Sequence, residues 1–178
     1  MPKKFRKNSQ SKLTVRAFPS CRIKGNSLPS THLVDRALPT QTTTQANGMK
    51  TKVLLADDHP PLVEAALAIL KPHYDIVGIA TDGAMLVSEA LRLRPDLIVS
   101  DITLPILNGI EAIHRLRLSN SQSKVVFLTV HAEEGFLKAC IAEGALGYVL
   151  KSRMKTQLIP AIEAALEGRA YVSPFVAK

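Results

Sequence analysis

Apolar and polar residues alternate in blocks from residue 52 onward, and the blocks predict strands and helices in strict succession. Short, nearly continuous runs of Leu, Ile, Val and Ala predict strands at residues 52–56, 75–80, 96–100, 124–129 and 146–150. Each is followed by helical spacing of apolar positions, up to about residue 71 and then over 84–94, 108–118, 132–143 and 155–167. Five strand–helix pairs predict an α/β fold with a five-stranded parallel sheet and helices on both faces. The nearly continuous apolar strands agree, because a parallel sheet is covered on both sides.

Most of the predicted strands end on residues whose chemistry differs from that of the strands. Asp57 and Asp58 follow the first strand and Asp101 follows the third, while the fourth ends at Thr129 and Lys151 follows the fifth. In an open parallel sheet, ligands bind beyond the carboxyl ends of the strands. We therefore expect three carboxylates, a hydroxyl and an ammonium group to meet at one edge of the sheet.

Each of these residues also has an ordinary structural explanation. Asp57 or Asp58 could cap the helix that follows, a role that Asp often fills. Asp101 could be a loop acid, Thr129 a β-branched strand residue and Lys151 a solvated charge. These explanations do not account for four strands that all end on a residue suited to one site.

Taken together, the five residues suit phosphoryl transfer. Clustered carboxylates repel one another, and a hard divalent cation such as Mg²⁺ relieves the repulsion through oxygen ligands. A carboxylate in such a cluster can act as a nucleophile and form an aspartyl phosphate. A metal ion, a lysine and a hydroxyl donor then stabilise the charge on the oxygens of the transferred group.

Three stretches of sequence at the ends of the predicted strands resemble a known family. They are Ala-Asp-Asp-His-Pro at 56–60, the run from Asp96 to Pro105 that continues to Asn108-Gly109, and Glu-Gly-Ala-Leu-Gly-Tyr-Val-Leu-Lys at 143–151. With these motifs in order, residues 52–172 resemble the receiver domain of two-component response regulators, in the NarL/FixJ-type branch with LuxR-type output domains. The resemblance implies a flavodoxin-like (CheY-like) fold of three α/β/α layers over residues 49–168.

The resemblance also implies how the acidic residues act. Asp101 would be the phosphoacceptor, and a sensor histidine kinase would supply the phosphoryl group. Asp58 would bind Mg²⁺ directly, and Asp57 would bind it through a coordinated water. Asp101 and the backbone carbonyl of Thr103 would complete the ligands that the protein supplies. The chain would then be a signalling domain and no enzyme beyond its own phosphorylation and dephosphorylation.

The remaining site residues would stabilise and transmit the phosphorylated state. Lys151 would pair with a phosphoryl oxygen, and Thr129 would move to donate a hydrogen bond to another. Tyr148 holds the place of the aromatic residue that swings inward with that threonine; its ordinary explanation is a half-buried aromatic at the sheet edge. In this family the face formed by the fourth helix, fifth strand and fifth helix mediates dimerisation or output contacts, so a phosphorylation-dependent homodimer is expected.

Two features depart from the family pattern or modulate it. Ser152 stands where many members have a proline after the lysine, often with a cis bond, and we expect a trans bond because a non-proline cis bond costs about 2.5–4 kcal/mol. Thr103 and His131 each lie two residues beyond a site residue, at positions that tune the lifetime of the phosphate in this family. We expect His131 to be a solvent-side residue.

The formal charge of +8 is confined to the first 48 residues, which carry nine Lys or Arg and one acid. This segment is rich in Pro, Ser, Thr, Asn and Gln, and its composition predicts a disordered basic extension. It could be an arm that contacts nucleic acid through phosphates, a targeting peptide, or the product of a start site assigned too far upstream, since Met49 precedes the first strand directly. We favour the last interpretation.

Residues 169–178 resemble the start of a linker to a helix-turn-helix domain. We therefore expect a transcriptional regulator whose DNA-binding part is absent here, so that this chain alone would not read DNA sequence; a stand-alone receiver or a pseudo-receiver acting as an interaction module is the alternative. Two cysteines give no disulfide framework, and no run approaches the roughly 20 apolar residues of a membrane span, so a cytoplasmic setting is expected. A haloacid-type phosphatase would need a second aspartate at position 103, where threonine stands.

Overall fold

The computed structural model describes residues 50–174; the extension predicted for residues 1–48 lies outside that range. The described elements are β1 (Lys52–Ala56), α1 (Pro60–Leu70), β2 (Asp75–Ala80), α2 (Gly83–Leu93), β3 (Leu97–Ser100), α3 (Gly109–Leu118), β4 (Lys124–Thr129), α4 (Glu134–Ala142), β5 (Gly147–Leu150), the short 3₁₀ helix η1 (Lys151–Arg153), α5 (Met154–Leu166) and β6 (Tyr171–Val172). Within this range, no helix combines the length and the hydrophobicity that crossing a membrane requires.

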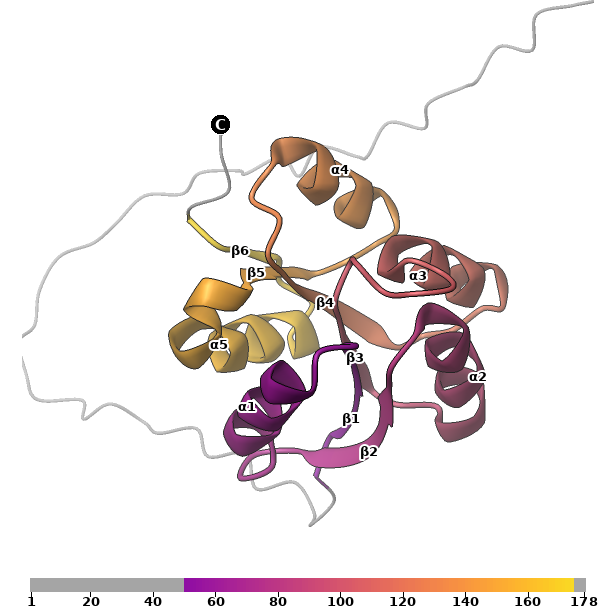
Figure 1. Cartoon of the computed structure of the whole chain (residues 1–178), viewed down its shortest axis with the longest axis horizontal. Helices are drawn as coiled ribbons and strands as arrows, with labels where there is room; N and C mark the ends of the chain where they lie inside the picture. Colours follow the sequence, from indigo (N-terminus) through magenta and orange to yellow (C-terminus); the bar gives the residue numbers. More distant parts are fainter. Residues whose placement is uncertain (1–49, 175–178) are drawn as a thin grey trace, which may run out of the picture. The chain divides into compact units, whose positions relative to one another are not determined.

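All strands of the sheet are parallel, in the order β2-β1-β3-β4-β5-β6 (Figure 1). The predicted parallel sheet with helices on both faces is confirmed, but it has one strand more than the five predicted. The additional strand, β6, pairs with β5 and lies in the segment predicted as the start of a linker. Two residues are too few to show a strand period in the sequence.

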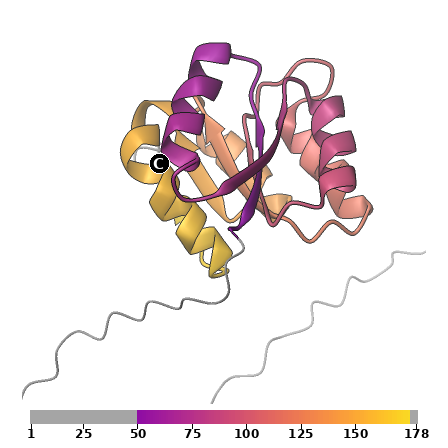
Figure 2. The same ribbon diagram turned by 90° about the horizontal axis from the view of Figure 1, so that it is seen from below.

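Two apolar cores lie on opposite faces of the sheet. Val53 and Leu55 of β1 face a core closed by α1 and α5, whereas Leu54 and Ala56 face a core closed by α2, α3 and α4. Figure 2 shows α1 and α5 on one side of the sheet and α2 and α3 on the other. Successive side chains of a strand point to opposite faces, so a strand covered on both sides must be apolar at every position.

The helix starts test the ordinary explanation for the first acidic pair. α2 and α3 begin with side-chain caps, because Asp82 accepts a hydrogen bond from the Met85 amide (2.7 Å) and Asn108 accepts one from Glu111 (2.9 Å). α1 instead begins after His59, with prolines in its first turn and no side-chain cap. The ordinary explanation that Asp57 or Asp58 caps α1 is therefore wrong, although Asp57 Oδ1 accepts a hydrogen bond from the His59 amide (2.9 Å).

Within residues 50–174 the structure also places a cysteine in the core and confirms the trans bond predicted after Lys151. Cys140 is fully buried in the core, where burial raises the pKa of its thiol to about 12. The peptide bond between Lys151 and Ser152 is trans, as are all others in the described range.

Candidate phosphoacceptor site

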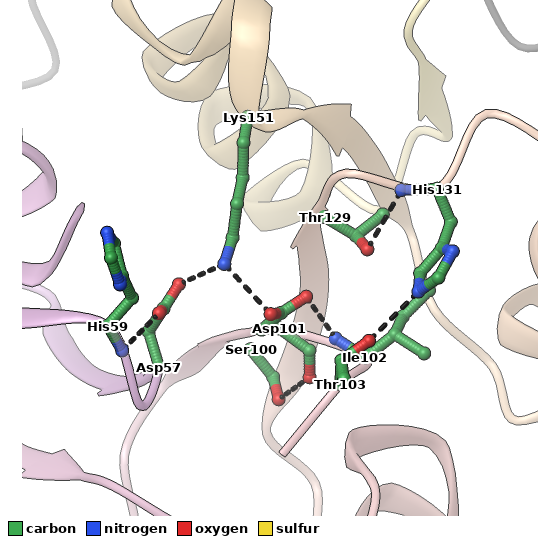
Figure 3. Close-up of polar contacts among 9 residues, drawn as sticks. All are labelled: Asp57, His59, Ser100, Asp101, Ile102, Thr103, Thr129, His131 and Lys151. Atoms are coloured by element: carbon green, nitrogen blue, oxygen red, sulfur yellow. Dashed lines mark hydrogen bonds and ion pairs between the residues drawn. The ribbon is translucent and has the colours of Figure 1, made fainter.

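The site lies where four neighbouring strands end. β1, β3, β4 and β5 are adjacent in the sheet and parallel, so their carboxyl ends share one edge. Asp57 follows β1, Asp101 follows β3, Thr129 ends β4 and Lys151 follows β5. Figure 3 shows these side chains converging from segments far apart in the sequence, as the strand pattern predicted.

The Lys151 ammonium group links two of the carboxylates. Its Nζ lies 2.7 Å from Asp57 Oδ2 and 2.8 Å from Asp101 Oδ2. All three side chains are at most 7% exposed. Burial opposes the charge of Lys151, but the hydrogen bonds and attraction of Asp101 and Asp57 outweigh it, so the pKa of Lys151 is raised. The interpretation of Lys151 as a solvated surface charge is therefore wrong.

Asp101 is a buried acid held by backbone and side-chain contacts. Its Oδ1 accepts a hydrogen bond from the Ile102 amide (2.6 Å), while its own amide donates to the Ala56 carbonyl (2.8 Å). Gly109, at the start of α3, packs so closely that a Cβ there would lie 2.0 Å from the Asp101 carbonyl oxygen. These contacts fix the carboxylate next to β1, where the other two acids lie.

Asp57, Asp58 and Asp101 form an acidic cluster. Each offers a carboxylate oxygen, and these oxygens lie within 4.8 Å of one another. Asp57 and Asp101 are buried and Asp58 is exposed, so the cluster opens toward solvent. A set of three carboxylate oxygens with one open side fits a hard cation that keeps part of its water shell, as Mg²⁺ does.

Thr129 and Tyr148 are connected through the loop after β4. Thr129 is fully buried, and its Oγ1 accepts a hydrogen bond from the His131 amide (3.3 Å). The Tyr148 hydroxyl donates to the His131 carbonyl oxygen (3.0 Å). Tyr148 is 1% exposed, and burial, more than nearby negative charge, raises its pKa. The interpretation of Tyr148 as a half-buried edge aromatic is wrong, because β6 extends the sheet beyond β5.

His131 has more contacts than a solvent-side residue would. Its ring stacks on Phe136 with centroids 4.1 Å apart, and its Nε2 lies 2.9 Å from Thr103 Oγ1 (Figure 3). Sequence reasoning missed this contact. The signal was present: Thr103 stands two residues beyond Asp101 and His131 stands two residues beyond Thr129, and the strands β3 and β4 that lead to them are neighbours in the sheet.

Comparison with known proteins places this site in a family. Residues 53–163 match the family described as the response regulator receiver domain. The transcriptional regulatory protein DegU of Brevibacillus brevis is 33% identical over 74% of this chain, and the response regulator GacA of Pseudomonas syringae is 32% identical over 71%. The chain spans only 57% and 60% of their respective lengths.

Solved structures agree with the sequence relatives. A two-component response regulator of the LuxR family from an Aurantimonas species is 34% identical, with a TM-score of 0.66, over 71% of this chain and 92% of that one. The response regulator domain of Thermotoga maritima CheB is 27% identical, with a TM-score of 0.61, over 66% of this chain and 97% of that one.

The chain thus belongs to the response regulator receiver domain family, the signalling domains of two-component systems that accept a phosphoryl group on an aspartate. The solved structures that it resembles include the receiver domain of a putative response regulator NarL from Mycobacterium tuberculosis and the LuxR-family regulator above, in agreement with the branch that the sequence motifs predicted.

Proposed function

We propose that Asp101 is the phosphoacceptor of this receiver domain. The single observation that carries the proposal is the contact of a buried Asp101 carboxylate with the Lys151 ammonium group, beside a second and a third acid. In the transfer, a carboxylate oxygen of Asp101 forms a bond to phosphorus. The bond from phosphorus to the histidine nitrogen of a sensor kinase breaks, and its electron pair stays on that nitrogen.

The neighbouring residues have separate tasks in this proposal. Asp58, Asp57, Asp101 and the backbone carbonyl of Thr103 would hold Mg²⁺, which when bound supplies positive charge to the phosphoryl oxygens. Lys151 is close enough to pair with one of those oxygens once the phosphoryl group separates it from Asp101. The Thr129 hydroxyl accepts from His131 and does not use its own hydrogen in that bond, so it can donate to another oxygen.

Phosphorylation would act as a switch through charge. The phosphoryl group adds about 1.5 to 2 negative charges and strong hydrogen-bond acceptors at a site where one lysine already faces three carboxylates. Thr129 and Tyr148 both contact His131, so a movement of Thr129 toward the phosphate reaches Tyr148 through that loop. The face of α4, β5 and α5 would change with it and mediate homodimerisation or output contacts.

The output is transcription control within a longer protein. The relatives are named transcriptional regulators, and this chain spans a little over half of their length. We propose that the chain acts in the cytoplasm and that a sensor histidine kinase is the donor. DNA sequence would be read by a domain outside this chain, and the chain would catalyse no reaction beyond its own phosphorylation and dephosphorylation. The alternatives of a pseudo-receiver and a phosphatase are not favoured by the family match.

Intact mass after incubation with acetyl phosphate and Mg²⁺ tests the proposal. We expect a gain of one phosphoryl group that a chelator prevents and that Asp101→Asn abolishes. Asp82→Asn is the matched control: it makes the same chemical change near the same edge of the sheet, and asparagine preserves the cap of α2. Labelling that survives Asp101→Asn would overturn the assignment, and so would a lack of labelling in the unaltered chain.

A further inference from the structure

The β6 segment forms hydrogen bonds both to the β5 segment and to α5. The Tyr171 amide donates to the Leu146 carbonyl (2.8 Å) and the Ser173 amide donates to the Tyr148 carbonyl (2.8 Å), which joins the segment to β5. Ser173 is also 1% exposed, and its hydroxyl donates to the Gln157 side chain of α5. A two-residue strand with these extra contacts is a specific attachment of the segment that follows α5.

The same segment covers the residue that links the site to the sheet edge. Tyr148 is the register partner of Val172, and side chains at paired positions of parallel strands lie side by side on one face. Both line an apolar groove of about 320 Å³ beneath α4, together with Leu137 and Cys140. Without β6, the Tyr148 ring would lie at the open edge of the sheet, as the sequence had suggested.

Tyr148 is therefore held at both ends. Its hydroxyl donates to the loop after β4, the loop whose His131 amide contacts Thr129, and its backbone carbonyl accepts a hydrogen bond from Ser173 at the end of β6. An outward rotation of the ring would lose the hydroxyl contact and would turn the ring toward its register partner Val172. Docking of β6 thus stabilises the inward position of the ring.

From these contacts we infer that β6 is a positioning segment: its docking holds Tyr148 inward and thereby couples the chain after α5 to the phosphoacceptor site. The coupling rests on the proposed function, whereas the positioning of Tyr148 does not. Coupling between two binding events is reciprocal, so a phosphoryl mimic at Asp101 and β6 docking would strengthen each other by the same factor.

Ser173→Pro and Ser173→Ala make a matched pair of variants for the full chain. Both lose the hydroxyl contact with Gln157, but only proline also removes the amide that donates to Tyr148. The chain is labelled with 3-fluorotyrosine, and Tyr148→Phe assigns the fluorine signal of Tyr148. We expect Ser173→Pro to move that signal and to expose it to a soluble paramagnetic reagent, while Ser173→Ala leaves it protected.

The double variant Tyr171→Pro with Ser173→Pro removes the two amide donors that bond to Leu146 and Tyr148, and it guards against residual docking. A Tyr148 signal that stays protected in this variant, with the circular dichroism of the folded domain retained, would overturn the inference. If the variant fails to fold, amide hydrogen exchange of the unaltered chain tests the inference instead. Beryllofluoride with Mg²⁺ should slow the exchange of the Tyr171 and Ser173 amides. Unchanged exchange in the presence of a bound mimic would equally overturn it.

The affinity for beryllofluoride separates this inference from the proposed function. We expect Ser173→Pro to bind the mimic at least about five-fold more weakly than Ser173→Ala, which is the lower end of typical coupling between sites. Equal affinities would refute the coupling even though the phosphoacceptor site works. Failure of the unaltered chain to bind the mimic, with Tyr148 still exposed by Ser173→Pro, would refute the proposed function and leave the positioning supported.

Discussion

The Lys151 ammonium group lies 2.8 Å from a carboxylate oxygen of Asp101, although 50 positions separate the two residues along the chain. The contact exists because β3 and β5 are parallel and flank β4, so that both strands deliver their carboxyl ends to one edge. Lys151 also contacts Asp57, so its single positive charge partly offsets two of the acids that would bind a metal ion. The lysine is therefore both a stabiliser of the resting site and a competitor for its cation.

Replacing this lysine should have opposite effects on metal binding and on phosphorylation. Lys151→Met keeps the length of the side chain but removes its charge, so Asp57 and Asp101 become available to Mg²⁺ and its affinity should rise several-fold. The rate of labelling by acetyl phosphate should fall by at least about 100-fold, since a group aimed at the developing charge typically contributes that much. Calorimetric titration and intact mass measure the two effects. Lys155→Met, at an exposed position of α5, should change neither; weaker Mg²⁺ binding in Lys151→Met would contradict the competition.

A methyl group at Gly109 should disturb the site through its backbone. The added Cβ would lie 2.0 Å from the Asp101 carbonyl oxygen, so either α3 or the loop that carries Asp101 must shift. We expect Gly109→Ala to lose about 1–3 kcal/mol of stability, the usual cost of overpacking, and to label more slowly. Thermal melting and the labelling rate check both effects.

Gly135→Ala is the control for this change, because no atom lies within 4 Å of the Cβ it would add in α4. It should melt at or slightly above the temperature of the unaltered protein. A Gly109→Ala protein as stable and as active as Gly135→Ala would contradict the close packing of α3 against Asp101.

The buried Tyr148 hydroxyl should make the fold sensitive to alkali. Burial, with smaller contributions from nearby negative groups, raises the pKa of Tyr148 above its ordinary value of 10.0. The unfolded chain loses this proton near that pH while the folded chain keeps it, so the free energy of unfolding should fall as pH rises above it. The slope from one such group is at most about 1.4 kcal/mol per pH unit.

Tyr148→Phe should remove this part of the slope. It also loses a hydrogen bond, but that loss lowers stability at every pH and leaves the comparison of slopes valid. Urea unfolding of both proteins below and above the ordinary tyrosine pKa measures the difference. Because Lys151 and Cys140 titrate in both proteins, their contributions cancel; identical slopes would mean that the hydroxyl is not buried in solution.

The first 48 residues should be dispensable for the site. Residues 50–174 already contain two apolar cores and the acidic cluster, and the excess positive charge of the sequence lies in residues 1–48. A protein beginning at Met49 should therefore melt at the same temperature and label at the same rate as the full chain. A large loss of either would show that the extension contributes to the domain and is more than the product of an upstream start site.

The succession of strands and helices along the chain, and the residues that follow the strands, could be predicted from the sequence alone. A strand covered by helices on both faces must be apolar throughout, so the apolar run at 97–100 predicted a buried strand. The polar Asp101 directly after this run was therefore a candidate site residue. The resemblance of the motifs to a known family then implied a role for each of these residues. This information is local in the chain, and a single sequence carries it.

The hydrogen-bond and ion-pair partners of these side chains depend on how the chain folds in three dimensions. Whether Lys151 would reach Asp57 as well as Asp101 depends on side-chain paths across four strands, and no spacing in the sequence encodes a distance of that kind. The contact between Thr103 and His131 likewise arises from two loops that meet in space. The burial of Tyr148 required β6, whose two residues have no period of their own and form a strand only because β5 offers a free edge.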